Sequence, residues 1–290
     1  MHDLLKPEYL WRPRQILRRL AFKASNESVP LRLPWNCTIR ARSAEVIGHS
    51  IATQGVYELP VTEAIMRLTD AGDISFDVGA NIGYMTLVLA LSAGPRGRVM
   101  SFEPNPDLHS TLRANVDNWK VLQIAPIEIK TFALSDRDGD GCLGFPADYG
   151  QNWGVASLEL QGGGVPVQLR RLDSLGHQSV GLLKVDVEGH EAAVFSGAQN
   201  LLAQKLIRDI VFEEHQPYPA PSHKLLLDHG YRIFRLTRST WRPLLLPADA
   251  PNRQAYLPSN FVATADPSRA MSRFREPGWY ALSNGKRHNR

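Results

Sequence analysis

The sequence has few of the features that mark a disulfide-rich, zinc-binding or membrane-spanning protein. Its 290 residues include only two cysteines, Cys37 and Cys142, which lack the CxxC spacing of a zinc site or a redox pair. No apolar run approaches the roughly 18 residues that a membrane-spanning helix needs. The N-terminus also lacks the apolar region of a signal peptide. We therefore expect a cytoplasmic protein with two reduced thiols.

The sequence also has only a small excess of charge of either sign. The net charge is +4, and hydrophobic residues make up 43% of the chain, which is ordinary for a soluble globular protein. Much of the positive charge lies near the two ends, and no long Lys/Arg stripe crosses the middle. The composition therefore gives no indication of a nucleic-acid partner.

The chain divides into three segments by composition. Residues 1–35 are a basic extension in which apolar residues alternate with arginines, so we expect an amphipathic helix that packs on the domain, with peripheral contact to a membrane surface as the alternative. Residues 36–268 carry the pattern of a folded domain. Residues 269–290 are polar and basic, and we expect a disordered tail from Met271 onward.

Within the domain, short apolar runs typical of strands alternate with helical spacings, after a first segment, Cys37–Ile51, that predicts a strand pair. Such alternation predicts a parallel sheet covered by helices, with ligands at the carboxyl ends of the strands. The expected strands are 74–78, 97–102, 127–134, 165–169, 182–187, 209–213, 231–236 and 260–264, and the expected helices are 59–68, 82–92, 106–118, 191–202 and 222–229. The Gly-rich and Asp-rich stretch 139–164 predicts a loop or a hairpin insertion.

The stretch FDVGANIG, residues 76–83, joins the first of these strands to a helix. Gly79 and Gly83 let a ligand or a neighbouring backbone approach this turn closely, and the helix N-terminus offers unpaired N–H groups. Asp77 stands where a dinucleotide fingerprint has its first glycine. A carboxylate there suits a cationic ligand, an ammonium or a sulfonium, better than a pyrophosphate. A tight turn without a ligand is the alternative.

Two further strand ends carry polar residues. Glu103, in SFEPNP, could accept hydrogen bonds from two ribose hydroxyls, or it could merely cap the following helix. Ser135 and Asp136, in ALSD, could bond the exocyclic amine of a purine. An Asp-rich turn explains this second pair nearly as well.

Ionisable residues are densest after the next two strands. Lys184, Asp186 and Glu188 alternate along LLKVDVEG and project to one side, where such charges are costly unless they pair or function. Glu213 and His215 close the following strand, in VFEEHQP. Together these residues could form an acid–base cluster or a metal site with oxygen and nitrogen ligands, and we favour acid–base or substrate contact without a metal.

In this order, the stretches resemble the FkbM family of S-adenosylmethionine-dependent methyltransferases. The similarity covers about residues 45–265, and it rests on FDVGANIGYMTLVLA, FEPNP, ALSD, LLKVDVEGHE and IVFEEHQP, of which KVDVEGHE is the more specific match. The resemblance implies a class I methyltransferase fold, an α/β (Rossmann-like) arrangement. Its sheet would have seven strands, mostly parallel with one antiparallel strand, closed by residues 231–236 and 260–264.

The resemblance also implies roles for single residues, with S-adenosylmethionine as the cofactor. The methionine part would lie against Asp77, Gly79, Asn81 and Gly83, approached by the Tyr57–Glu58 pair of GVYE; the ribose would lie on Glu103, and the adenine beside Ser135 and Asp136. Asp186 falls where such folds place a residue facing the methyl group. The family typically methylates a hydroxyl of a sugar, a polyketide or another small metabolite. The stretch 139–164 and the N-terminal extension match nothing in the family, and both could shape the acceptor pocket.

We therefore expect methyl transfer to a hydroxyl oxygen, in which alignment supplies most of the catalysis and a base accepts the proton. Asp186, His215 and Glu213 are the candidate bases, and we favour His215 or Asp186 because both stand at strand ends. The segment DVEG stands where enzymes that methylate nucleic-acid amines carry an NPPY-type tetrapeptide, which favours oxygen over nitrogen and a small acceptor over nucleic acid. The alternatives are a catalytically silent protein that binds a cofactor or a partner, and a nicotinamide-dependent oxidoreductase, which the missing first glycine disfavours.

Overall fold

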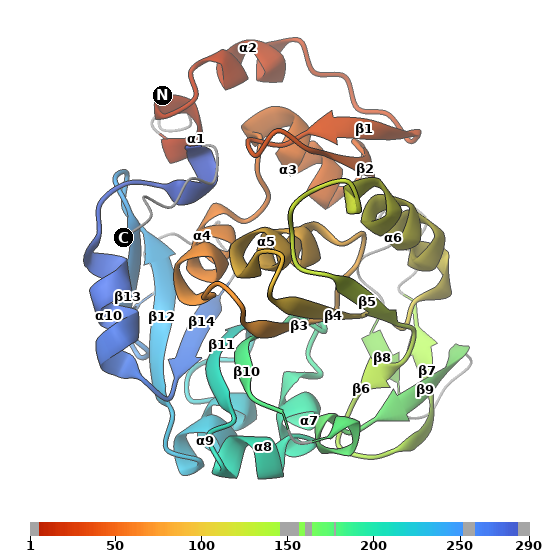
Figure 1. Ribbon diagram of the computed structural model, residues 1–290, viewed down its shortest axis with the longest axis vertical. Coiled ribbons are helices and arrows are strands. Elements are labelled where there is room, and N and C mark those ends of the chain that lie inside the picture. The colour runs from red at the N-terminus through yellow and green to blue at the C-terminus, as the bar shows by residue number, and fades with distance from the viewer. Residues whose placement is uncertain (1–5, 146–156, 160–163, 177, 252–258, 284–290) are drawn as a thin grey trace.

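The computed structural model describes residues 6–145, 157–159, 164–176, 178–251 and 259–283. Its centre is an eight-stranded sheet in the order β13-β12-β14-β11-β10-β3-β4-β5 (Figure 1). Five neighbouring strands run parallel: β11 (Ile207–Glu213), β10 (Val180–Val185), β3 (Ile74–Val78), β4 (Arg98–Phe102) and β5 (Ile127–Lys130). β14 (Asn260–Thr264) is antiparallel to both of its neighbours, β11 and β12 (Arg232–Arg238).

The expected class I methyltransferase sheet is confirmed, because seven of these strands include a single reversed one, β14. The sequence analysis missed the eighth strand, β13 (Pro243–Pro247), which pairs with β12 at the edge. A run bounded by prolines is a poor strand signal, and an edge position is where a sheet tolerates it.

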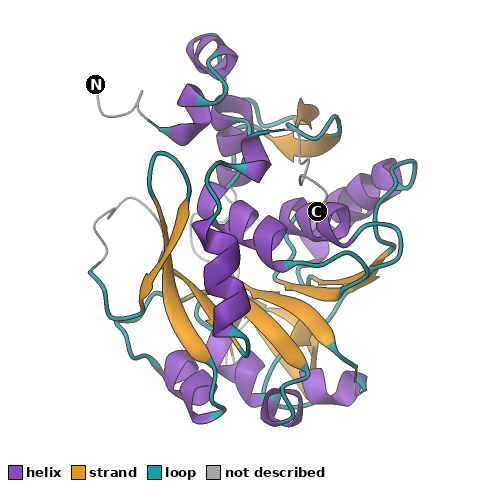
Figure 2. Cartoon of the chain, turned by 60° about the vertical axis from the view of Figure 1, so that its left-hand side comes forward, coloured by secondary structure: helices purple, strands orange, loops and turns teal. Residues whose placement is uncertain are grey.

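Helices cover both faces of the sheet (Figures 1 and 2). One core packs α4 (Leu59–Leu68), α5 (Tyr84–Ala93) and α6 (Pro106–Trp119) on one face, and another packs α7 (Glu191–Ser196), α8 (Gln199–Ala203) and α9 (Pro221–Asp228) on the opposite face. Successive side chains of β10 point alternately into the two cores: Leu182 packs in the first and Leu183 in the second. Since every residue of β10 is buried, Lys184 must find its partners inside the protein.

The expected strand pair at 37–51 is wrong in its second half. β2 (Thr38–Arg42) pairs with β1 (Ser28–Arg32), but α3 (Val46–Gln54) follows it. Ile47 and Ile51 stand one helical turn apart and both pack against the first core, which a short window of alternating residues does not reveal. Gly55 ends this helix in the left-handed conformation, with φ +88°.

The expected disordered tail is also wrong for the part that the structure describes. Residues 267–275 form α10 (Pro267–Arg275), and η4 (Tyr280–Leu282) follows. Arg67 on α4 is 1% exposed and donates hydrogen bonds to the carbonyls of three tail residues, Arg273, Glu276 and Gly278. Its ion-pair partner Glu63 accepts from the backbone N–H groups of Tyr280 and Ala281. The tail is ordered because this buried pair satisfies its backbone.

The predicted strand 127–134 is split. Its end, β6 (Ala133–Leu134), joins a second sheet of order β6-β9-β7-β8, in which β9 is Val165–Arg170. Within the stretch 139–164, β7 (Gly139–Gly144) and β8 (Ser157–Glu159) pair antiparallel, and residues 146–156 and 160–163 lie outside the described residues. This second sheet stands beside the carboxyl end of β4 and β5 (Figure 1).

The N-terminal extension contributes two short helices rather than one. α1 (Pro7–Leu10) and α2 (Arg14–Leu20) lie at the top of Figure 1, and Gln15 of α2 donates a hydrogen bond to the Ala52 carbonyl of α3. On the opposite side of α2, Leu17 is 68% and Leu20 is 80% exposed. Within the described residues, no helix has the length and apolar character required to cross a membrane.

Candidate active site

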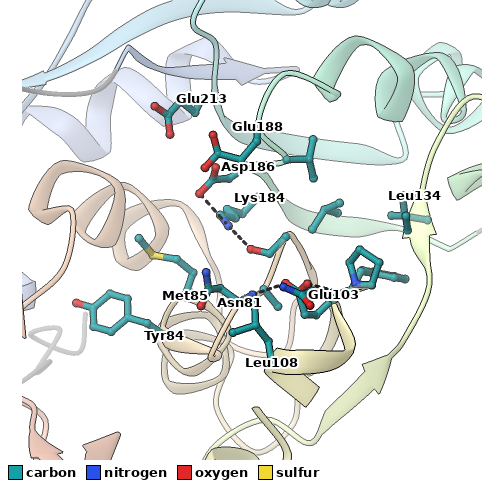
Figure 3. A pocket seen from close by; sticks show the side chains of 18 of the residues that line it. Asn81, Tyr84, Met85, Glu103, Leu108, Leu134, Lys184, Asp186, Glu188 and Glu213 are labelled. Carbon is teal, nitrogen blue, oxygen red and sulfur yellow. Dashed lines mark hydrogen bonds and ion pairs between the residues drawn. The ribbon is translucent and has the colours of Figure 1, made fainter. Parts of the chain in front are cut away.

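A cavity opens at the carboxyl ends of β3, β4 and β10, where a doubly wound sheet binds its ligands (Figure 3). Its polar lining includes Asn81, Glu103, Lys184, Asp186, Glu188 and Glu213. Its apolar wall includes Phe102, Leu108, Phe132 and Leu134, and the second sheet adds Leu143 and Leu158. The sequence analysis missed this wall, since Leu143 and Leu158 carry no motif and only their apolar character could have indicated a role.

The two glycines of DVGANIG are required by the packing of the chain itself. A Cβ atom on Gly79 would lie 1.9 Å from the carbonyl oxygen of Asp186, and one on Gly83 would lie 2.8 Å from Cδ1 of Leu112. Both residues also have positive φ, +77° and +93°. Close packing therefore explains why these positions are glycine, and the turn so formed presents Gly79, Ala80 and Asn81 to the cavity.

Asp77 lies beneath that turn rather than in the cavity wall. Its buried carboxylate accepts a hydrogen bond from Thr86 Oγ1 at 2.5 Å and lies 3.3 Å from Nζ of Lys184. Lys184 also donates to the Gly79 carbonyl at 2.9 Å and lies 3.4 Å from Asp186. Burial raises the pKa of Asp77, and the Lys184 charge opposes that shift. Contact between Asp77 and a cationic ligand stays a prediction; in this geometry its partner is Lys184, which it holds against the turn.

Glu103 lies in the cavity wall as expected and is already oriented by the backbone. Oε2 accepts from the N–H of Asn81 at 2.7 Å, and Oε1 accepts from the N–H of Asn105 at 2.9 Å. Burial raises the pKa of Glu103 to about 7, against the effect of these two N–H groups. Since each carboxylate oxygen has a second lone pair, the fixed carboxylate can still accept from two vicinal hydroxyls.

Ser135 and Asp136 do not line the cavity. The Ser135 hydroxyl is bonded to Asp136 at 3.1 Å and to Nε2 of His190 at 2.9 Å, so this pair ties β6 to the start of α7. The cavity wall near them comes from the preceding Phe132, Ala133 and Leu134. Their contact with an adenine stays a prediction, and the apolar residues just before them are better placed for it.

The carboxylates of Asp186, Glu188 and Glu213 gather at one side of the cavity (Figure 3). The loop that carries the first two is fixed by Glu191, which accepts from the N–H groups of Val187 and Gly189. Burial raises the pKa of Glu213 to about 7, and the neighbouring Asp186 charge adds to the effect.

His215 lies outside this cavity, although it touches its acidic side. Its Nδ1 is 3.7 Å from Glu213 and its Nε2 is 3.8 Å from Glu188, but its side chain is 57% exposed. It is therefore positioned to contact the two carboxylates from the solvent side rather than from within the cavity.

Tyr57 and Glu58 precede α4 and complete the acidic side. Tyr57 lines the cavity and packs edge-on against Tyr84, with ring centroids 5.8 Å apart. Glu58 hydrogen-bonds to Asn260, and burial together with the charges of Asp186 and Glu213 raises its pKa to about 8. The backbone of Glu58 is in the left-handed region with φ +40°, an unusual conformation for this residue type.

These residues fit a positively charged cofactor. Four carboxylates, on Glu58, Asp186, Glu188 and Glu213, face a single buried cation, Lys184. Burial is the largest cause of the raised pKa values of Glu58 and Glu213, and the negative charge of Asp186 adds to it. A cationic sulfonium or ammonium would offset that negative charge. Across the described ranges, no group of three or more His, Cys, Asp or Glu residues is arranged to hold a metal ion.

A comparison with protein families identifies the domain that carries this site. The model of the methyltransferase FkbM domain matches residues 77–233, which is more than half of the chain and includes the ends of β3, β4, β10 and β11 that line the cavity. Tyr57 and Glu58 lie outside the matched range. The fold, the site and this match together define a class I methyltransferase that uses S-adenosylmethionine. The chain belongs to the FkbM methyltransferase family, and the resemblance stated from its motifs is confirmed.

Curated relatives agree with this assignment. The chain is 30% identical over 241 residues to the 31-O-demethyl-FK506 methyltransferase FkbM of Streptomyces tacrolimicus, covering 70% of this chain and 88% of that protein. It is 29% identical over 163 residues to the hexuronic acid methyltransferase AglP of Haloferax volcanii, covering 54% of this chain and 62% of that protein. A match of 30% identity with the AMB antimetabolite synthetase AmbE of Pseudomonas aeruginosa covers 64% of this chain and spans only 11% of that protein.

Proposed function

We propose that this methyltransferase transfers its methyl group to a hydroxyl oxygen of a small metabolite or of a sugar-containing acceptor. The observation that carries the proposal is the cluster of carboxylates, Asp186, Glu188 and Glu213, which line the cavity at the strand ends. A hydroxyl is a poor nucleophile until a base accepts its proton, and a carboxylate whose pKa is raised, as that of Glu213 is, suits that task. The names of two relatives, an O-demethyl-FK506 methyltransferase and a hexuronic acid methyltransferase, support this acceptor class.

The cofactor would be held by residues from several strand ends. Glu103 would accept from the ribose hydroxyls, and the wall around Leu108 and Leu134 would enclose the adenine. Asn81 and the backbone of Gly79 would face the methionine part, with the acidic side of the cavity compensating its charge. The cofactor supplies an activated methyl group, so the protein must chiefly align the acceptor and accept a proton.

Among the three candidate bases, the geometry favours Glu213. Asp186 is 3.4 Å from Nζ of Lys184, so its carboxylate is already engaged in an ion pair. His215 lies on the solvent side, where it would assist Glu213 rather than contact the acceptor. Glu213 lines the cavity, and its pKa of about 7 lies near neutral pH, which is the range in which a general base is most effective.

Calorimetric titration with S-adenosylhomocysteine, with NAD as the control ligand, tests the cofactor site directly. We expect micromolar binding of the first ligand and none of the second. Methyl transfer should then fall at least about 100-fold in Glu213→Gln and less than 10-fold in His215→Ala, while both variants keep their affinity for S-adenosylhomocysteine. Equal losses in the two variants would indicate that Glu213 and His215 act together as the base.

We also propose that α2 contacts an anionic membrane surface. Its exposed Leu17 and Leu20 lie opposite Gln15, and Arg14 and Arg18 flank them. Apolar side chains between arginines suit an anionic lipid headgroup layer, to which each arginine contributes about 1 kcal/mol. Sedimentation with phosphatidylserine vesicles should decrease in a Leu17→Ser/Leu20→Ser variant, and unchanged sedimentation would contradict this contact.

A further inference from the structure

A second cavity adjoins the first on the side of the N-terminal helices. It is enclosed by α1, α3 and the start of α4, with β12 and β14 closing the other side. Val46 and Tyr57 line both cavities, so the two share a wall. Glu58 lines the second cavity and is bonded to Asn260, which stands opposite Glu213 in the register of β11 and β14. The carboxylates of the first cavity therefore lie at the junction of the two.

Glu8, on α1, indicates that a ligand occupies this second cavity. Its side chain is 2% exposed, and Oε1 forms an ion pair with Nη1 of Arg238 at 2.5 Å. Oε2 is buried and has no hydrogen-bond partner. A buried polar atom left unsatisfied costs about 1–3 kcal/mol, so native proteins nearly always provide a donor. Because Glu8 lines the cavity, a ligand hydroxyl or N–H is well placed to supply that donor.

The remaining lining residues define the chemistry of the ligand. His49, Gln54 and Asn260 can each donate and accept hydrogen bonds, and Ser50, whose hydroxyl donates to the Val56 carbonyl, can still accept one. This set matches a compound with several hydroxyls. Tyr57, Leu59 and Leu236 provide an apolar surface of the kind that packs on the C–H face of a ring. Two carboxylates, Glu8 and Glu58, stand with two cationic residues, Lys6 and Arg238, so the site does not select for one sign of charge.

We propose that this second cavity is the acceptor site of the methyltransferase and that it takes a sugar-like, polyhydroxylated ring, with Glu8 accepting a hydrogen bond from one hydroxyl. The inference rests on the proposed O-methyltransferase function and names its acceptor class and binding site. Another hydroxyl of the same ring would then extend past Tyr57, which borders both cavities, to reach Glu213 and the methyl group in the cofactor cavity. In this arrangement the N-terminal extension is part of the substrate site.

Ligand-observed saturation-transfer NMR on the full chain, saturated with S-adenosylhomocysteine, tests the site without requiring turnover. The probes are methyl β-D-glucopyranoside and methyl β-D-glucuronide, and cyclohexanol serves as an alcohol with a single hydroxyl. The variant Ser50→Trp fills the cavity from α3, and Glu8→Gln removes the charge of the free carboxylate oxygen. Ser110→Trp, on the exposed side of α6, is the matched control for the added tryptophan.

We expect at least one glycoside to give a signal with the wild-type protein, and that signal to fall at least 5-fold in Ser50→Trp. It should fall about 3-fold in Glu8→Gln and remain unchanged in Ser110→Trp. Melting temperatures and the affinity for S-adenosylhomocysteine establish that each variant is folded. If Ser50→Trp does not fold, the loss in Glu8→Gln carries the test alone.

Other outcomes separate the site from the function. Equal glycoside signals in the wild type and both cavity variants would overturn the assignment of this cavity. A stronger signal from cyclohexanol than from the glycosides, or no glycoside signal from the wild type, would overturn the acceptor class. If the protein binds a glycoside here but does not bind S-adenosylhomocysteine, the result would support a sugar-binding site in this cavity and would contradict the proposed methyl transfer.

Discussion

The two cavities of this protein are built in different ways. The first is made largely by short contiguous stretches, 78–85, 102–108 and 184–188, which lie at the ends of neighbouring parallel strands. The second joins segments far apart in the chain, and its buried ion pair, Glu8–Arg238, connects residues 230 positions apart. Motifs reveal a site of the first kind because its residues are close in sequence. A site of the second kind depends on how distant segments pack.

The largest effect should follow from Gly79→Ala, which tests how tightly the first cavity is built. The added Cβ would lie 1.9 Å from the Asp186 carbonyl oxygen, so one strand end must move. We expect a loss of at least about 4 kcal/mol in unfolding free energy, together with loss of S-adenosylhomocysteine binding. Gly72→Ala is the control, because Gly72 has φ +90° but no atom within 4 Å of its added Cβ, and it should cost only about 1 kcal/mol. Similar costs at the two positions would show that backbone conformation matters here and packing does not.

Lys184→Met should have the next largest effect. It leaves Asp77 and Asp186 without their cation and the Gly79 carbonyl without its donor. Breaking a buried pair costs about 3 kcal/mol, whereas Lys130→Met, which removes a partly exposed pair with Glu128, should cost below about 1 kcal/mol. Urea denaturation of both variants measures the difference. A cost for Lys184→Met as small as that of the control would mean that Asp77 is protonated in the native protein.

Glu103→Gln and Asp136→Asn compare two positions that the sequence analysis both assigned to the cofactor. Glu103 lines the cavity and Asp136 does not. Loss of charged hydrogen bonds to ribose should weaken S-adenosylhomocysteine binding roughly 10-fold to 100-fold in Glu103→Gln. Asp136→Asn should change the affinity less than about 2-fold. Calorimetry measures both affinities. An equal loss of affinity in Asp136→Asn would indicate that Asp136 contacts the cofactor after all.

The smallest effect should be a pH dependence of stability that arises where the two cavities meet. The pKa values of Glu58, about 8, and Glu213, about 7, exceed the roughly 4.3 of an unfolded glutamate. Burial is the largest cause of both shifts, and the negative charge of Asp186 raises both pKa values further, whereas Lys184 lowers both. The hydrogen bond from Asn260 lowers the pKa of Glu58. His215 lowers the pKa of Glu213, and Glu188 raises it. The folded state thus holds these protons more tightly, so its advantage is complete below about pH 4.3 and is lost as the pH rises through 7–8.

The melting temperature should therefore fall by a few degrees between pH 5.5 and pH 8.5, and Glu58→Gln should flatten part of this decline. Glu27→Gln, at an exposed position of the N-terminal segment, is the control and should leave the slope unchanged. A slope in Glu58→Gln as steep as that of the wild type would place the raised pKa on another group.

Local patterns predicted much of the fold and of the first cavity. The alternation of apolar strands and helices predicted a parallel sheet, and Glu103, Asp186 and Glu213 could be named because strand ends meet at one edge. The buried position of Asp77 could not be predicted, since it depends on Lys184 of a strand that is adjacent only in space. The order of the C-terminal tail could not be predicted either, because its hydrogen-bond partners, Arg67 and Glu63, lie on the distant helix α4.

By itself, the sequence determined the alternation of strands and helices and the glycine turn, because each depends on contiguous residues with a fixed period or spacing. Its motifs also determined the family resemblance, which implies the class I sheet. Only the tertiary structure decided that Gly79 is required by the Asp186 carbonyl and that Asp77 lies below the cavity rather than in it. It also placed Glu8 and Arg238 in one wall of a second cavity. Such contacts join segments that are far apart in the chain, so no local sequence pattern predicts them. They are fixed by the packing of the whole domain.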